Sequence, residues 1–169
     1  MLTQLDQNRI ALVSMPVARL RPYPKNARTH SKKQLRQIAD SIQKFGFTNP
    51  VLISDDDEII AGHGRVEAAK LLGMQSVPTL RLSHLDAAQR RAYFIADNKL
   101  ALNAGWDREL LATELQALID LEFDVEITGF SSAEIDLVLD EAREASVHAQ
   151  ETPEDAIPRP IDPGTAVRI

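Results

Sequence analysis

The feature that most constrains the fold of this chain is the segment IIAGHGRVEAAKLLG, residues Ile59–Gly73, in which an apolar strand turns directly into a helix. Gly62 and Gly64 in the turn permit another group to approach the backbone closely. The first turn of the helix presents unpaired N–H groups and a positive potential, and Arg65 adds a fixed cation. The segment therefore predicts an α/β element suited to a phosphate, although it matches neither a Walker loop nor a dinucleotide-binding GxGxxG. A plain turn with a surface arginine is the alternative.

A helix is expected before this element, and a short strand before that helix. The strand covers Ile10–Met15 and is followed by a connector whose prolines exclude a regular helix. Ser31 is a good N-cap with Gln34 three residues later, and Gly46 ends the helix. The apolar residues that repeat on one face are Leu35, Ile38, Ala39, Ile42 and Phe45. This period predicts a helix that packs on a core along that face.

Three more strands and a helix are expected up to residue 105. Val51–Ser54 and Glu58–Ala61 flank an acidic turn and predict a hairpin. A further strand is expected at Val77–Leu82, where Pro78 indicates an edge position because proline donates no ladder hydrogen bond. A helix capped by Asp86 follows. The alternation of strands and helices predicts an α/β (α+β) domain with a small mixed sheet.

The rest of the chain is expected to be helical and then extended. Asp107–Leu121 and Ser131–Ala145 predict two amphipathic helices, the second with a capping box formed by Ser131 and Glu134. From residue 147 the sequence is rich in Pro, Glu and Asp without an apolar period, which is typical of a linker. We therefore divide the chain into a domain at residues 1–105, an acidic helical subdomain at 106–146 and a flexible linker or tail at 147–169.

The net charge of −6 conceals a difference between the two parts of the chain. Residues 1–105 carry 15 basic and 9 acidic side chains, whereas residues 106–169 carry 4 basic and 16 acidic ones. Positive charge is concentrated between Arg19 and Lys44, and such a stretch attracts phosphates. The candidate DNA contacts in it are Arg19, Arg21, Lys25, Lys32, Lys33 and Arg36. A solvated helix face is an equal alternative.

The composition excludes several classes of protein. The chain has no cysteine, so disulfides, zinc–thiolate sites and thiol nucleophiles are ruled out, and a reducing compartment is expected. No apolar run reaches the roughly 18 residues that a membrane span needs, and the polar start lacks the apolar core of a signal peptide. We expect a soluble, cytoplasmic protein that has no membrane partner.

The order of these elements, together with several short motifs, resembles the ParB/sulfiredoxin superfamily over about residues 12–103. ParB proteins carry a turn and helix close to GERRxRAA, and the GHGRVEAAK of this chain keeps Gly62, Arg65 and Ala69 in the matching positions. Sulfiredoxins carry GCHR at this place, with the cysteine as nucleophile. His63 replaces that cysteine, so the chain is not expected to be a sulfiredoxin.

The resemblance implies a site for a nucleoside triphosphate, CTP or ATP, together with Mg²⁺. Asn26-Ala27-Arg28 resembles the family's Asn-Pro-Arg turn, whose arginine approaches the triphosphate. Asp97-Asn98 resembles the Glu-Asn pair that holds the magnesium of a bound CTP, and such oxygen ligands suit Mg²⁺. The implied phosphate-binding residues are Asn26, Arg28, Gly62, His63, Gly64 and Arg65, and the implied metal-binding residues are Asp97 and Asn98.

A departure from the family bears on catalysis. The first long helix begins with Lys32, Lys33 and Gln34, where ParB proteins generally carry acidic residues, one of them implicated in the nucleotide reaction. The remaining catalytic candidates are His63, as a general base, and Asp97. Nucleotide binding is therefore predicted ahead of hydrolysis, and the identity of the nucleotide and a weak NTPase activity stay open.

The acidic helices, with their TGFSSAEID phrase, resemble the tail of ParB-like domains fused to DNA-modification methyltransferases, many of them phage-borne. They stand where partition proteins carry a helix-turn-helix DNA reader. The resemblance implies DNA as a partner, a nucleotide-driven homodimer, and a C-terminal methyltransferase domain in a longer chain. Two alternatives remain, a metal-dependent DNA nuclease that uses Asp97 and a protein-interaction module. The leucines that belong either to such a module or to the chain's own core are Leu110, Leu111, Leu115 and Leu118.

Overall fold

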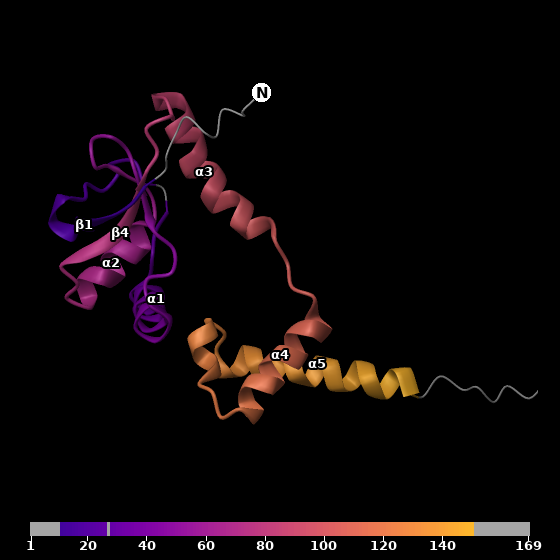
Figure 1. The fold of residues 1–169 in the computed structure, drawn as a ribbon. Helices are drawn as coiled ribbons and strands as arrows, with labels where there is room; N and C mark the ends of the chain where they lie inside the picture. The colour runs from indigo at the N-terminus through magenta and orange to yellow at the C-terminus, as the bar shows by residue number, and fades with distance from the viewer. Residues whose placement is uncertain (1–10, 27, 151–169) are drawn as a thin grey trace, which may run out of the picture.

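The computed structural model describes residues 11–26 and 28–150, and its first part is built on a four-stranded mixed sheet (Figure 1). The strands are β1 (Leu12–Pro16), β2 (Val51–Ile53), β3 (Ile59–Ala61) and β4 (Ser76–Arg81). Their order in the sheet is β1-β4-β2-β3. β4 is antiparallel to β1 and parallel to β2, whereas β2 and β3 form the expected antiparallel hairpin. The predicted mixed α/β sheet is confirmed.

The strand that contains Pro78 is internal, so the prediction of an edge strand is wrong. β4 lies between β1 and β2, and Pro78 is opposite Ser14 of β1. The parallel pairing with β2 begins at Thr79, one residue after the proline. The pairing with β2 therefore needs no backbone N–H at residue 78, so the lack of an N–H in Pro78 is tolerated on that side of the strand.

Two helices pack against each other, and the second of them contributes to the first core. α1 (Lys32–Phe45) is capped by Ser31, whose hydroxyl accepts a hydrogen bond from the N–H of Gln34, and it ends at Gly46 as expected. α1 packs on α2 (His63–Leu71), which contacts β2 and the 3₁₀ turn η2 (Val17–Arg19). The buried core residues are Met15, Val17, Leu20, Val51, Ile53, Ile59, Val66, Ala69 and Val77.

Phe45, the last residue expected on the buried face of α1, is 52% exposed. Its ring instead stacks on Phe123 in the second part of the chain, with ring centroids 6.4 Å apart. Lys44 lies over the same Phe123 ring at 4.7 Å from its centroid, a cation–π contact. The C-terminal end of α1 therefore faces the helical subdomain and not the sheet.

α3 (Ala87–Asn103) extends from the sheet domain toward the second part of the chain (Figure 1). It begins with the expected capping box between Asp86 and Gln89. Phe94 is its buried residue, whereas Ile95, Leu100 and Leu102 are 65%, 66% and 64% exposed. Most of the apolar surface of α3 therefore faces solvent.

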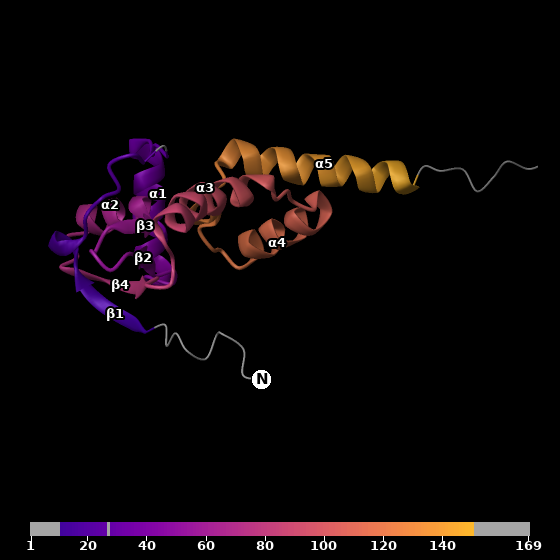
Figure 2. The ribbon, with the colours of Figure 1, turned by 90° about the horizontal axis from the view of Figure 1, so that it is seen from above.

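The second part of the chain is helical and has a core of its own. α4 (Arg108–Asp120), the 3₁₀ turn η3 (Val125–Thr128) and α5 (Ser132–Gln150) follow α3, and α4 and α5 lie side by side (Figure 2). The buried residues of this part are Leu111, Ala112, Leu115, Val125, Ile135 and Val138, with Leu118 partly buried. Leu110 is 66% exposed, so it does not belong to this core.

The boundaries of the last helix differ from those expected. Ser131 and Glu134 make the predicted capping contacts at its start. The helix continues to Gln150, so residues 147–150, expected to be linker, are helical. The rest of the expected linker, 151–169, lies outside the described residues. Within the described ranges, no helix combines the length and the apolar character needed to cross a membrane.

Candidate functional site

A cavity of about 130 Å³ lies where α2 begins, between the connector before α1, α1 itself and α3. Its lining residues are Arg28, His30, Ile38, Ala61, Gly62, His63, Gly64, Arg65, Phe94, Asp97 and Asn98. Seven of the eight residues that the sequence assigns to phosphate and metal binding are in this set, and Asn26 is the exception. Residues separated by up to 70 positions in the sequence thus line one small polar cavity.

Gly62 and Gly64 are required by the packing of this cavity. Gly62 caps α2 in a left-handed conformation, with φ of +102°, and a Cβ there would lie 2.9 Å from Nη2 of Arg65. A Cβ on Gly64 would lie 3.0 Å from the ring of His30 and 3.1 Å from Ile38. Real Cβ atoms essentially never come closer than 3.0 Å to a non-bonded heavy atom. The glycines therefore make room for the arginine of the cavity and for the approach of α1.

Arg65 is held against this turn with part of its hydrogen-bonding capacity unused. Its Nη2 donates to the carbonyl oxygen of Pro50 at 3.2 Å. Its Nε–H is buried and has no acceptor within the described part of the chain. Burial lowers the pKa of Arg65, and the nearby Asp97 carboxylate opposes that shift. The side chain stays charged, because an arginine pKa is too high for deprotonation in a protein.

His63 is a hydrogen-bond acceptor for the connector before α1. Its Nε2 accepts from the backbone N–H of Tyr23 at 3.1 Å, so the proton of the neutral ring is on Nδ1. Burial lowers the pKa of His63, and the charge of His30 lowers it further. The ring nitrogen that carries the free lone pair of neutral His63 is thus engaged with the backbone of Tyr23, and a catalytic role of His63 as a general base stays a prediction.

Asn26 shapes the turn that presents Arg28. Its Oδ1 accepts a hydrogen bond from the N–H of Arg28 at 2.8 Å, the pattern of an Asx turn. Asn26 is absent from the cavity lining, whereas Arg28 belongs to it. Asn26 therefore positions Arg28 in this structure, and its direct contact with phosphate stays a prediction. His30 is fixed in turn by a 3.1 Å hydrogen bond between its Nδ1 and Gln34 Oε1.

Asp97 and Asn98 enter the cavity from the middle of α3. Asn98 Nδ2 donates to the carbonyl oxygen of Phe94 at 2.8 Å, which leaves its Oδ1 as the free acceptor. One carboxylate and one amide oxygen fit a Mg²⁺ ion that takes its other ligands from phosphates and water. No cluster of three or more His, Asp or Glu side chains suited to a metal occurs in residues 11–26 and 28–150.

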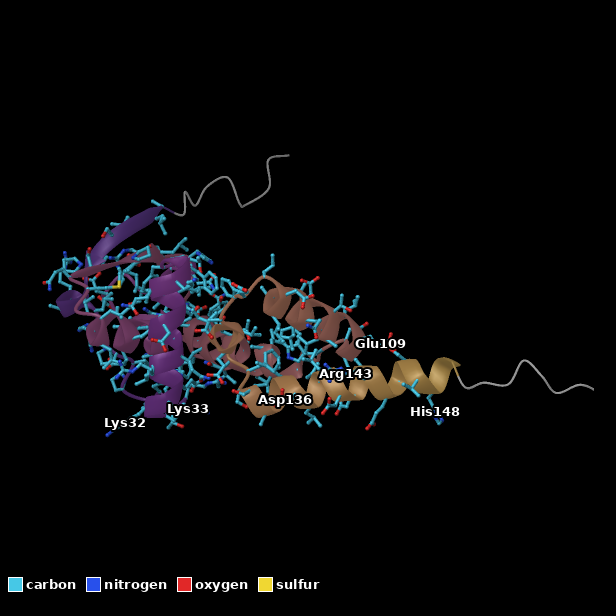
Figure 3. The ribbon with its side chains drawn as sticks, turned by 90° about the horizontal axis from the view of Figure 1, so that it is seen from below. Lys32, Lys33, Glu109, Asp136, Arg143 and His148 are labelled. Atoms are coloured by element: carbon cyan, nitrogen blue, oxygen red, sulfur yellow. The ribbon has the colours of Figure 1, made fainter. Side chains whose placement is uncertain are left out.

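The residues predicted to contact DNA differ in whether their charges are paired or exposed. Arg19 is paired with Asp57 at 2.8 Å, and Arg81 pairs with the same carboxylate at 2.6 Å, so Arg19 is not a free cation. Arg21 is exposed, and its backbone bonds to the β2–β3 hairpin. The exposed cations at the start of α1 are Lys32, Lys33 and Arg36. Lys32 and Lys33 extend away from the body of the molecule (Figure 3).

Sequence reasoning did not assign Tyr23 and Phe94 to the site. Phe94 lines the cavity, and its ring contacts His63 edge-on at a centroid distance of 5.8 Å and Tyr23 at 5.4 Å. The available signal was a single phenylalanine between polar residues, one turn before Asp97. That signal does not distinguish a site wall from an ordinary core contact.

Two family models match the chain. The ParB N-terminal domain matches residues 1–98, and the ParB-methyltransferase HTH domain matches residues 109–167. The second match relates the acidic helices to a helix-turn-helix family. It revises the interpretation that these helices stand in place of such a domain, and it extends the related region through most of the expected linker.

Relatives and solved structures agree with the first match. The ParB-like nuclease domain-containing protein YnaK of Escherichia coli is 52% identical over 83 residues, which are 49% of this chain and 95% of that protein. The chromosome-partitioning protein Spo0J of Thermus thermophilus is 34% identical over 80 residues, which are 45% of this chain and 30% of that protein. The chain thus covers a small part of the partition protein.

A solved structure supports the fold over most of the chain. The C-terminally truncated chromosome-partitioning protein ParB of Caulobacter crescentus, complexed with CTP-gamma-S, has a TM-score of 0.64 and 22% identity. The likeness covers 84% of this chain and 87% of that one. With the domain match over residues 1–98, these findings show that the chain belongs to the ParB N-terminal domain family.

Proposed function

We propose that this chain binds a nucleoside triphosphate with Mg²⁺ in the cavity at the start of α2 and acts on or beside DNA. The observation that carries the proposal is Arg65, a half-buried side chain whose buried Nε–H is unused, in a cavity at a helix N-terminus. A buried donor without an acceptor costs about 1–3 kcal/mol, and a bound anion would recover part of that cost. The related ParB that was solved with CTP-gamma-S supports a triphosphate as that anion.

The cavity offers complementary groups for the parts of such a ligand. Arg28, Arg65 and the N–H groups of the first turn of α2 suit the phosphates. His63 Nδ1–H is a further donor, because Nε2 is already used as an acceptor. Asp97 and the Oδ1 of Asn98 suit the magnesium ion. When bound, that ion would neutralise phosphate charge and fix the geometry of the triphosphate.

Isothermal titration of the purified chain with CTP, ATP and GTP, each with and without magnesium, tests the proposal. We expect saturable binding of one nucleotide that strengthens with magnesium. Arg65→Glu should abolish it while the circular dichroism spectrum is unchanged, and Arg36→Glu, the same charge change on an exposed position of α1, should retain it. Equal affinity of the wild type and the Arg65→Glu variant would reject this site.

A metal-dependent nuclease is the second candidate, and the name of the Escherichia coli relative, a ParB-like nuclease domain-containing protein, is the observation in its favour. A two-metal nuclease gathers several convergent carboxylates. Among the described residues Asp97 is the one carboxylate that lines the cavity. Magnesium-dependent nicking of plasmid DNA that disappears in the Asp97→Ala variant would favour the nuclease over the binding domain.

Features outside the cavity favour three partners for the proposed binding domain. The HTH match and the exposed cations at the start of α1 favour a role at DNA, and the name of that family favours a link to a methyltransferase. The exposed Ile95, Leu100 and Leu102 of α3 favour a homodimer. Sedimentation with and without the nucleotide tests the dimer, and a monomer under both conditions would exclude it.

A further inference from the structure

A second, larger cavity of about 310 Å³ lies beside the first, and Phe94 lines both. It is formed by the connector at Tyr23–Lys25, by β3 and by the first half of α3. The rings of Tyr23 and Phe94 lie 5.4 Å apart and inclined at 53°, so two aromatic side chains form part of its wall. Phe94 is buried and Tyr23 is half-buried, so both are already partly desolvated.

The rim of this second cavity is positively charged. Lys25, Arg90 and Arg91 line it, and Glu58 is the carboxylate among its lining residues, which gives three cations against one anion. Within residues 11–26 and 28–150, the ion pairs involve other arginines and lysines and leave these three cations without a partner. An aromatic wall beside free cations is the combination used to bind single-stranded nucleic acid.

We propose that the second cavity binds one unpaired nucleotide of a DNA or RNA strand. The base would lie against Tyr23, and Arg90, Arg91 and Lys25 would contact the phosphates on either side. A base inside a duplex is stacked on both faces and does not reach a concave aromatic wall unless it is unstacked. The Glu58 carboxylate suits an exocyclic amino group of the base, because it accepts hydrogen bonds.

Fluorescence anisotropy with a labelled deoxycytidine oligonucleotide of twelve residues, whose bases carry an exocyclic amino group, tests the proposal on the full chain. Removing two phosphate contacts in Arg90→Ala/Arg91→Ala should reduce the salt dependence of log K against log salt by about 1.4, at about 0.7 per contact on a single strand. Tyr23→Leu keeps an apolar side chain and should weaken binding at least about fivefold through loss of base stacking.

Three comparisons make the result decisive. Lys70→Ala/Lys99→Ala removes two exposed charges from residues that line neither cavity and should retain the affinity and the salt dependence of the wild type. A duplex of the same length should bind more weakly than the single strand, and a cytidine oligonucleotide, which differs from the probe only in its 2′-hydroxyl groups, distinguishes RNA from DNA as the strand that is bound. Equal losses in the two double variants, or tighter binding of the duplex, would overturn the proposal.

Nucleotide binding is measured separately so that the two cavities are distinguished. Titration of CTP and magnesium into Arg90→Ala/Arg91→Ala should give the affinity of the wild type, because neither arginine lines the first cavity. Loss of oligonucleotide binding with CTP binding intact supports the second cavity. Retention of oligonucleotide binding in this variant overturns it, whatever the outcome for CTP.

Discussion

Gly62→Ala is expected to damage nucleotide binding more than it damages the fold. Gly62 has φ of +102° and ψ of 22°, so an alanine there costs about 1–2 kcal/mol of backbone strain. Gly73, just after α2, has φ of +68°, and a Cβ added there would have nothing within 4 Å. Gly73→Ala therefore carries a similar strain without a steric clash and is the matched control.

The difference between the two variants is the position of Arg65. The new Cβ at residue 62 would lie 2.9 Å from Nη2 of Arg65, so the guanidinium has to move away from the carbonyl oxygen of Pro50. The displaced guanidinium also loses its hydrogen bond to a bound phosphate, and loss of one hydrogen bond to a charged group costs about 1.5–3 kcal/mol, which corresponds to roughly ten- to hundredfold weaker nucleotide binding. Urea unfolding and calorimetric titration with CTP and magnesium measure the two effects. Equal nucleotide affinities for Gly62→Ala and Gly73→Ala would refute the reasoning.

Three further predictions concern the titrating groups. The hydrogen bond from Arg81 is the largest cause that lowers the pKa of Asp57. The Asp57 carboxylate therefore stabilises the fold above the unfolded pKa of about 3.9, and this stabilisation is lost as the pH falls through the folded pKa. Asp57→Asn should have a lower free energy of unfolding in urea than the wild type at pH 7, and the difference should vanish in acid. Burial lowers the pKa of His63, so the free energy of unfolding should fall as the pH drops below about 6.5. His63→Gln keeps a hydrogen-bond acceptor for the N–H of Tyr23 and should reduce this dependence on pH. An unchanged slope of unfolding free energy against pH would contradict the prediction. Asp97→Ala should bind nucleotide without the gain from magnesium, and a retained gain in calorimetry would remove Asp97 from the metal site.

The local rules of helix capping and hairpins predicted most of the elements. Ser31 with Gln34, Asp86 with Gln89, and Ser131 with Glu134 each mark a helix start that the structure contains. Such signals succeed because the cap and its N–H partner are close in sequence, so no tertiary information is needed.

The errors arose where tertiary contacts decide. Pro78 was assigned to an edge because its missing donor was considered without the register of β2, which begins one residue later. Phe45 was assigned to the core by its period on α1, but the end of that helix faces Phe123. In both cases the deciding partner is distant in the sequence, and local periodicity contains no information on it.

In the candidate site, too, local sequence signals identified some residues, whereas the roles of others depend on distant contacts. The glycines and Arg65 were identified from one contiguous segment, and the resemblance added Arg28, Asp97 and Asn98, which the structure brings to the same cavity. The separate roles of Asn26 and His63 depend on hydrogen bonds to backbone groups, which residue types alone do not reveal.

The connector at Tyr23 gives the two cavities a physical connection. The backbone N–H of Tyr23 is bonded to His63 in the first cavity, whereas the Tyr23 side chain lines the second. Phe94 contacts both of these rings. We therefore expect a ligand that shifts His63 to change the affinity of the second cavity, and a ligand on Tyr23 to change the affinity of the first. Because such coupling is reciprocal in free energy, any factor by which nucleotide changes strand affinity must equal the factor by which the strand changes nucleotide affinity.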